Sequence, residues 1–168
     1  SDKAKFIFSK SGLLSAWTYN NQSVMTAGPE YANFRWVEND EAAGNTASAA
    51  NGIDASTRAM NYTVAADGKS AQFTVDAAGT LCSYNFVYDV YANGVMELTA
   101  SYTPQASDLR RIGMLMRFPA AFDNVSYYAR GPWENYIDRQ TASYLGRYTT
   151  TVTDMFEAYP RPQTCGNH

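Results

Sequence analysis

Residues 84–102 read YNFVYDVYANGVMELTASY, and this stretch decides the fold. Large apolar side chains alternate with polar ones on both sides of Asn93-Gly94, which is the period of a strand with one buried face. Asn93-Gly94 supplies the two positive-φ positions of a type I′ turn. The stretch therefore predicts an antiparallel hairpin. Its apolar face is expected to hold Tyr84, Phe86, Tyr88 and Val90 on the first strand and Met96, Leu98, Ala100 and Tyr102 on the return strand.

The same period continues over most of the chain. Short apolar runs recur at spacings near ten residues and are separated by turn signals such as Ser9–Gly12, Asn20-Asn21 and Asp67-Gly68. No stretch of ten or more residues holds a 3.6-residue period, so we expect an all-β antiparallel sandwich. Further strands are expected at residues 6–8, 13–19, 24–25, 62–65, 72–75, 112–118 and 125–129.

One segment, Ala42–Ala59, breaks this pattern because it is rich in Ala, Asn, Gly, Ser and Thr and has no aromatic residue. It is expected to be a long loop. Two readings stay open for it, a functional loop and a mobile surface insertion.

Composition excludes several classes of function. The 168 residues fit one domain spanning 1–168. A hydrophobic content of 45% with only 17% charged residues argues against disorder. A net charge of -3 without a basic run argues against a nucleic-acid partner, and no apolar run approaches the roughly 20 residues that span a membrane. The only histidine, His168, is the last residue, which argues against a Ser-His-Asp triad or a histidine metal site.

A few residues allow competing interpretations. The acidic cluster Glu38, Asp40 and Glu41 is either a solvated loop, a sugar-facing group or a Ca²⁺ site. Cys82 and Cys165 are expected to be free thiols rather than a disulfide. Trp17, Trp36 and Trp133 could each stack on a sugar or pack in the core, and Trp36, beside the expected loop, is the best placed to stack.

Glu134 and Asp138 could be a catalytic carboxylate pair. They are four positions apart in a turn-rich segment flanked by Arg130 and Arg139. A structural network in which the arginines bind the carboxylates is therefore the favoured reading.

Both ends of the chain carry a family pattern. Residues 125–139 read VSYYARGPWENYIDR, and they are followed by Ala142-Ser143, Gly146, Tyr148, Tyr159, Pro162-Gln163 and Gly166-Asn167. The N-terminal third carries Gly28-Pro29 and then Asn33-Phe34-Arg35-Trp36. The chain thereby resembles the C-terminal β domain, or small-chain domain, of the β-galactosidases in family 2 of the glycoside hydrolases.

The resemblance implies a β supersandwich similar to galactose mutarotase. It also implies retaining hydrolysis of a terminal β-D-galactoside by two glutamates that lie in a separate α/β barrel. The chain is thus expected to be a C-terminal fragment of a multidomain enzyme, and truncation within the sandwich at its C-terminal end stays open. It is expected to be inactive alone and to hold no catalytic residue, metal or cofactor. Any divalent cation would belong to the parent enzyme.

The expected partners are a β-galactoside or galactose, bound through the parent enzyme, and the barrel of the same chain. A homo-oligomer is expected for the full enzyme. The alternative is a free-standing carbohydrate-binding module, whereas a mutarotase-like epimerase is disfavoured by the single terminal histidine. Cytoplasm and periplasm both stay open as the compartment.

Two groups of residues are assigned expected roles on this basis. The loop expected to border the substrate contains Arg35, Trp36, Glu38, Asn39 and Asp40. The motif expected to be structural contains Arg130, Gly131, Pro132, Glu134, Asn135, Tyr136, Asp138 and Arg139.

Overall fold

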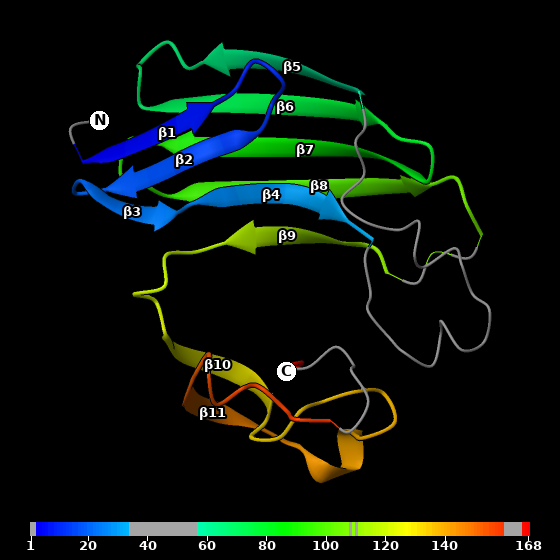
Figure 1. The fold of residues 1–168 in the computed structure, drawn as a ribbon. Helices are drawn as coiled ribbons and strands as arrows, with labels where there is room; N and C mark the ends of the chain where they lie inside the picture. The colour runs from blue at the N-terminus through cyan, green and yellow to red at the C-terminus, as the bar shows by residue number, and fades with distance from the viewer. Residues whose placement is uncertain (1–2, 34–56, 108, 110, 160–165) are drawn as a thin grey trace. The chain divides into compact units, whose positions relative to one another are not determined.

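The structure is a computed structural model that describes residues 3–33, 57–107, 109, 111–159 and 166–168 (Figure 1). These ranges contain β-strands, one short 3₁₀ helix and no α-helix, which confirms the all-β prediction. In the same ranges, no helix is long and apolar enough to cross a membrane. The strands are β1 (Ala4–Phe8), β2 (Leu14–Tyr19), β3 (Gln22–Met25), β4 (Ala27–Ala32), β5 (Thr57–Val64), β6 (Ser70–Ala78), β7 (Cys82–Tyr91), β8 (Met96–Pro104), β9 (Gly113–Arg117), β10 (Asn124–Gly131) and β11 (Tyr144–Thr151), and the 3₁₀ helix η1 is Gln140–Ala142.

All strand pairs are antiparallel, and the chain divides into two compact units. The first unit holds the sheets β1-β2-β3, β4-β9 and β5-β6-β7-β8. The second unit holds the ribbon β10-β11 and the described residues that follow it. One sandwich domain across residues 1–168 stays a prediction.

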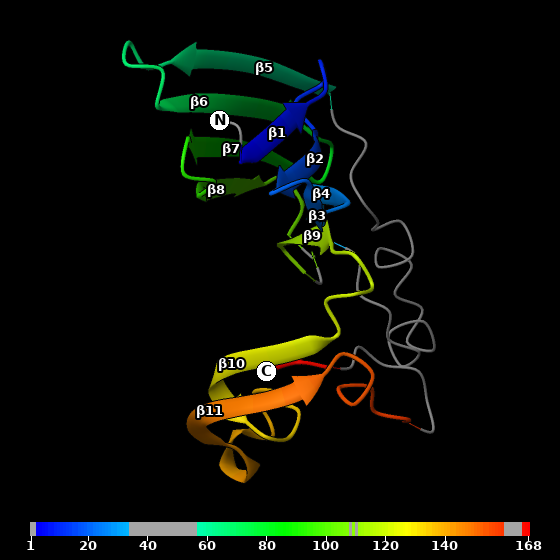
Figure 2. The same cartoon turned by 90° about the vertical axis from the view of Figure 1, so that its left-hand side faces the viewer.

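Two layers form the first unit. The sheet β1-β2-β3 lies across one face of the sheet β5–β8, as both views show (Figures 1 and 2). Phe8 of β1 stacks on Phe73 of β6 with ring centroids 4.1 Å apart and meets Tyr88 of β7 edge-on at 5.1 Å. Tyr31 of β4 stacks on Tyr84 of β7 at 5.5 Å. Aromatic rings therefore fill the space between the layers, as expected for a sandwich core.

The hairpin β7–β8 has the predicted apolar face, because the residues expected on that face are paired with each other across the two strands. Val90 pairs with Met96, and Cys82 pairs with Pro104 at the other end. The predicted inner face of β7 is buried, with Phe86 and Tyr88 each 1% exposed. Cys82 is a free, fully buried cysteine on this face, whereas Cys165 lies outside the described residues.

The turn between these strands differs from the prediction. Gly94 has φ of 94°, but Asn93 is not in the positive-φ region, so the turn is not type I′. The N–H of Gly94 donates to Tyr91 O at 2.9 Å, and the Asn93 side chain accepts from the N–H of Val95 at 3.0 Å. The side chain of Asn93 thus stabilises the turn, although the backbone of Asn93 is not in the left-handed region. Asp67-Gly68 behaves in the same way, whereas Asn20 and Asn21 both have positive φ.

Three further differences concern where strands lie. β4 was not expected, because its sequence AGPEYA contains a proline and lacks apolar alternation. β11 was not expected either, because its sequence YLGRYTTT has an interior glycine and three threonines. β5 begins at Thr57, inside the segment predicted as a loop. That part of the loop prediction is wrong, and residues 42–56 lie outside the described ranges.

The second unit is built on the ribbon β10–β11. Asn124 pairs with Thr151 at one end and Gly131 with Tyr144 at the other. Tyr127 and Tyr148 lie opposite each other with ring centroids 5.4 Å apart, and the His168 ring lies 4.8 Å from that of Tyr127. Residues at the end of the described chain therefore pack on the ribbon.

Candidate functional site

Glu134, which follows β10, is the most buried acidic residue of the family motif, with 5% of its surface exposed. Its Oε2 accepts a hydrogen bond from the hydroxyl of Tyr159. Nη1 of Arg139 lies 3.9 Å from the same oxygen and donates to the Tyr159 hydroxyl at 2.7 Å. The three side chains thus form a chain of contacts from Arg139 through Tyr159 to Glu134.

Tyr159 keeps its proton in this arrangement. The hydrogen bond to Glu134 is the main cause that raises the pKa of Tyr159, since the donor must stay protonated to serve the carboxylate. The guanidinium of Arg139 also lies 5.3 Å from the centre of the Tyr159 ring. Glu134 consequently acts as a hydrogen-bond acceptor inside the unit, which suits a structural role.

Arg130, in β10, makes a different kind of contact. Its Nη1 donates to the backbone oxygens of Ser143 at 3.0 Å and Gln140 at 3.3 Å. Ser143 is 2% exposed, and its hydroxyl lies 3.5 Å from the carbonyl oxygen of Trp133. Arg130 therefore ties the 3₁₀ segment to the ribbon through carbonyl groups, and this differs from the expected arginine–carboxylate pair.

Asn135 and Tyr136, which follow Glu134 in the motif, form hydrogen bonds with Asn167 near the end of the described chain. The N–H of Asn135 donates to the carbonyl oxygen of Asn167 at 2.7 Å. The side-chain amide of Asn167 donates to the Tyr136 hydroxyl at 2.8 Å. Residues 134–136 thus contact chain segments more than twenty positions away, which is what a bracket between distant segments requires.

The side chains around Gly131 leave no room for a Cβ atom at this position. A Cβ there would lie 2.7 Å from the Tyr127 hydroxyl and 2.9 Å from the Tyr148 ring. No side chain fits without moving these rings. Pro132 follows through a cis peptide bond, and beyond it Trp133 and Ile137 are 65% and 90% exposed.

The two acidic residues of the motif, Glu134 and Asp138, lie in different surroundings. Retaining glycosidases place two carboxyl groups about 5 Å apart on either side of the bond to be cleaved. Here the buried Glu134 is engaged by Tyr159 and Arg139, whereas Asp138 is exposed. Among the described residues, no group of three or more His, Cys, Asp or Glu side chains could hold a metal ion.

The loop expected to border the substrate cannot be placed. Arg35, Trp36, Glu38, Asn39 and Asp40 all lie outside the described residues, as do Glu41 and Pro162-Gln163. The role of that loop stays a prediction.

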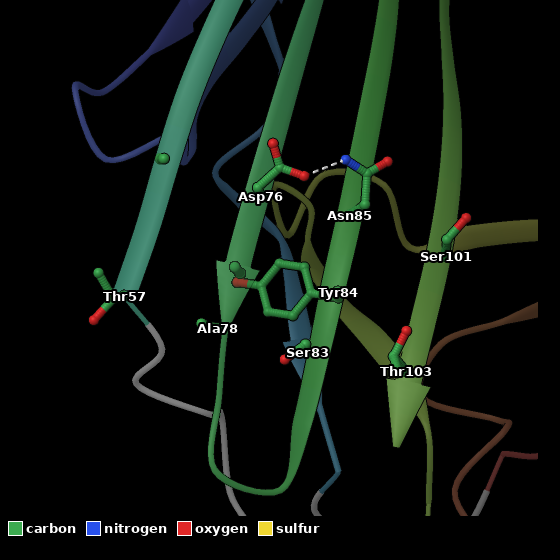
Figure 3. Close-up of a pocket in the computed structure, with 10 residues that line it drawn as sticks. Thr57, Asp76, Ala78, Ser83, Tyr84, Asn85, Ser101 and Thr103 are labelled. Atoms are coloured by element: carbon green, nitrogen blue, oxygen red, sulfur yellow. Dashed lines mark hydrogen bonds between the residues drawn. The ribbon is translucent and has the colours of Figure 1, made fainter. Parts of the chain in front are cut away.

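A second candidate, a hollow that was not predicted from the sequence, lies on the outer face of the sheet β5–β8 (Figure 3). Its volume is about 540 Å³. Asn85 of β7 donates to the carboxylate of Asp76 of β6 at 2.8 Å, and Ser101 of β8 is the next residue in the same row. The signal was present in the turn at Ala78-Gly79, because folding the chain there pairs Asp76 with Asn85.

Ser143 and Tyr159 belong to the family pattern in the sequence, but their contacts with the Gly131–Arg139 motif were not predicted. Both stand outside the motif, and only the register of β10 with β11 and the path of the chain after β11 bring them to it.

The whole chain, residues 1–168, matches the family model described as Beta galactosidase small chain. The chain belongs to this family. A beta-galactosidase of Priestia megaterium is 39% identical over 90 residues, which cover 52% of this chain and 9% of the relative. One of Staphylococcus xylosus is 36% identical over 95 residues, covering 55% of this chain and 10% of the relative.

A third beta-galactosidase, from Lactobacillus delbrueckii subsp. bulgaricus, matches along nearly the full chain. It is 28% identical over 172 aligned positions, which cover 97% of this chain and 17% of the relative. The matched stretches therefore span 9%, 10% and 17% of the length of these three relatives.

Proposed function

We propose that this small-chain domain is the non-catalytic, C-terminal β-sandwich part of a family 2 β-galactosidase. The parent enzyme hydrolyses terminal β-D-galactosides with retention, through two glutamates of an α/β barrel that this chain does not contain. Membership of the family and the names of the relatives support the activity of the parent enzyme. The domain supports the barrel and lends residues 35–40 to the rim of the galactose site.

The burial and hydrogen bonding of Glu134 are the main support for this proposal. Its carboxylate is buried and accepts a hydrogen bond from Tyr159, while Arg139 lies beside it. A general acid or a nucleophile has to reach the substrate. A buried carboxylate that is bound by side chains of its own domain is better suited to a structural role than to a catalytic one. The family motif is thus suited to stabilising the fold of the domain that supports the barrel.

The full-length protein offers a direct test. Glu134→Gln keeps the shape and an acceptor oxygen for Tyr159, so the rate constant for an aryl β-galactoside is expected to stay within about threefold of the native value while stability falls. Replacement of either barrel glutamate is expected to abolish turnover. Loss of turnover in Glu134→Gln at unchanged folding would refute the structural role of the motif.

A further inference from the structure

The hollow on the outer face of β5–β8 is large enough to hold a small molecule. Its volume of about 540 Å³ falls in the range of roughly 300–1,000 Å³ typical of small-molecule sites. It exists because the outward positions at this end of the sheet are small. Ala59 of β5 lines the hollow, as does Ala78 of β6, which is labelled in Figure 3, and larger side chains at these positions would fill the space.

The polar groups of the hollow come from three neighbouring strands. Asp76 pairs with Asn85, and Asn85 pairs with Ser101, so the three side chains lie in one row across β6, β7 and β8. The amide of Asn85 donates to one oxygen of Asp76 at 2.8 Å, which fixes the orientation of both groups. The second carboxylate oxygen of Asp76 and the amide oxygen of Asn85 can then accept from a ligand.

Hydroxyl groups complete the lining in the next row. The Ser83 hydroxyl oxygen accepts from Nε2 of Gln105 at 2.7 Å, which leaves its hydrogen to donate to a ligand oxygen. Thr103 lies opposite Ser83, and Thr57 lies opposite Ala78. Their hydroxyls offer both donors and acceptors. The alanines of the lining, Ala59, Ala77 and Ala78, form its apolar floor.

Charge limits the class of ligand. Of the described residues that line the hollow, none is Lys, Arg or His, and the only formal charge is that of Asp76. An anion would be repelled by that carboxylate, and a lone carboxylate is a poor site for a divalent cation. A neutral molecule that carries many hydroxyls on a C–H framework matches both the polar row and the apolar floor.

From this lining we infer that the hollow is a binding site for a neutral saccharide. The choice of a galactoside as the first ligand to test rests on the proposed function. Because a typical neutral hydrogen bond contributes modestly, removal of Asn85 is expected to weaken binding about threefold to tenfold.

The chain offers a matched control for that substitution. Gln72 of β6 donates to Asp89 of β7 at 2.9 Å, on the same face of the same two strands but outside the hollow. Asn85→Ala and Gln72→Ala therefore remove equivalent amide–carboxylate contacts, and only the first lies in the site. Ala78→Trp fills the hollow at an exposed position and serves as a blocking variant.

The test uses the full protein that carries this chain, labelled with a diazirine-bearing β-galactoside and mapped by peptide mass spectrometry. We expect labelling on peptides of β6, β7 and β8 that lactose displaces, that Asn85→Ala lowers about threefold to tenfold, and that Ala78→Trp abolishes. Gln72→Ala is expected to label like the native protein.

Absent labelling of these strands would overturn the inference, as would labelling that Ala78→Trp leaves intact or that Gln72→Ala lowers as much as Asn85→Ala. The melting temperature of each variant is measured, and each variant is labelled at the same interval below its own melting temperature. A loss of labelling then reports on the site and not on unfolding. Turnover of an aryl β-galactoside in the same samples reports separately on the proposed function, since hydrolysis can fail while labelling succeeds and the reverse.

Discussion

The Tyr159 hydroxyl donates a hydrogen bond to the buried carboxylate of Glu134, across 25 positions of the chain. Arg139 donates to the same hydroxyl at 2.7 Å. This one phenol therefore connects the family motif with the segment that follows β11. The stability of the second unit should depend on it.

Tyr159→Phe is predicted to destabilise the protein by about 1–3 kcal/mol, because it leaves a buried carboxylate without its donor. The measurement is the free energy of unfolding in urea. Tyr128→Phe is the control, since Tyr128 is a tyrosine of the same unit that is 65% exposed, and a change within about 0.5 kcal/mol is expected for it. Equal effects of the two substitutions would show that the Tyr159 hydroxyl is not what holds Glu134.

Gly28→Ala is predicted to cost about 3 kcal/mol or more, or to prevent folding. Gly28 in β4 has φ of 92°, and a Cβ there would lie 2.3 Å from the backbone oxygen of Leu115 in β9. Backbone of a paired strand cannot easily move away, so both strain and overlap add to the cost. Thermal unfolding of the variant measures it.

Gly113→Ala is the matched control for Gly28→Ala in the same two-stranded sheet. The nearest atom to its added Cβ is the Ala32 oxygen at 3.9 Å, and its φ is not positive. Stability is expected to stay the same or to rise by about 0.5–1 kcal/mol, because alanine has less freedom than glycine in the unfolded chain. A melting temperature for Gly28→Ala as high as that of Gly113→Ala would contradict the account of β4 packing.

Alkaline pH is predicted to destabilise the protein through its buried tyrosines. Burial raises the pKa of Tyr88 far above the usual value of 10, and burial also raises the pKa of Tyr102. A pKa that is higher in the folded state contributes stability below about pH 10, and that stability is lost as the pH rises further. For Tyr88 the loss should be about 1.4 kcal/mol per pH unit.

Urea unfolding at pH 8, 10 and 11, with phenolate absorbance recorded alongside, tests this expectation. Tyr88→Phe should be less sensitive to pH above 10 than the native protein. Native stability that is constant up to pH 11 would show that Tyr88 is not held in its neutral form by the core.

The fold class was predictable because the alternation of apolar and polar residues is clearest in β7, whose apolar side chains are among the most buried of the described residues. Tyr84, Phe86 and Tyr88 alternate with polar residues, and each has at most 5% of its surface exposed. β11 was not predictable in the same way, since its partner β10 alone decides which of its residues are covered. The turn type at Asn93-Gly94 was wrong because the Asn side chain can stabilise a turn from either backbone conformation.

The candidate sites show a similar division. The motif at Gly131–Arg139 was visible as a string, but its partners Tyr159 and Ser143 follow from the path of the chain beyond the motif. The saccharide hollow depends on strand register, which places Asp76 beside Asn85 and small residues around them. Composition carries no trace of such a juxtaposition, because single polar residues on a wet strand face are ordinary.

We expect this small-chain domain to hold no catalytic carboxylate pair of its own. The most direct test of this expectation is the hydrolysis of an aryl β-galactoside by the purified 168-residue chain, beside the same chain carrying Glu134→Gln and Asp138→Asn. We predict no turnover above the uncatalysed rate for either protein. Turnover that copurifies with the native chain and disappears in the double variant would contradict the claim.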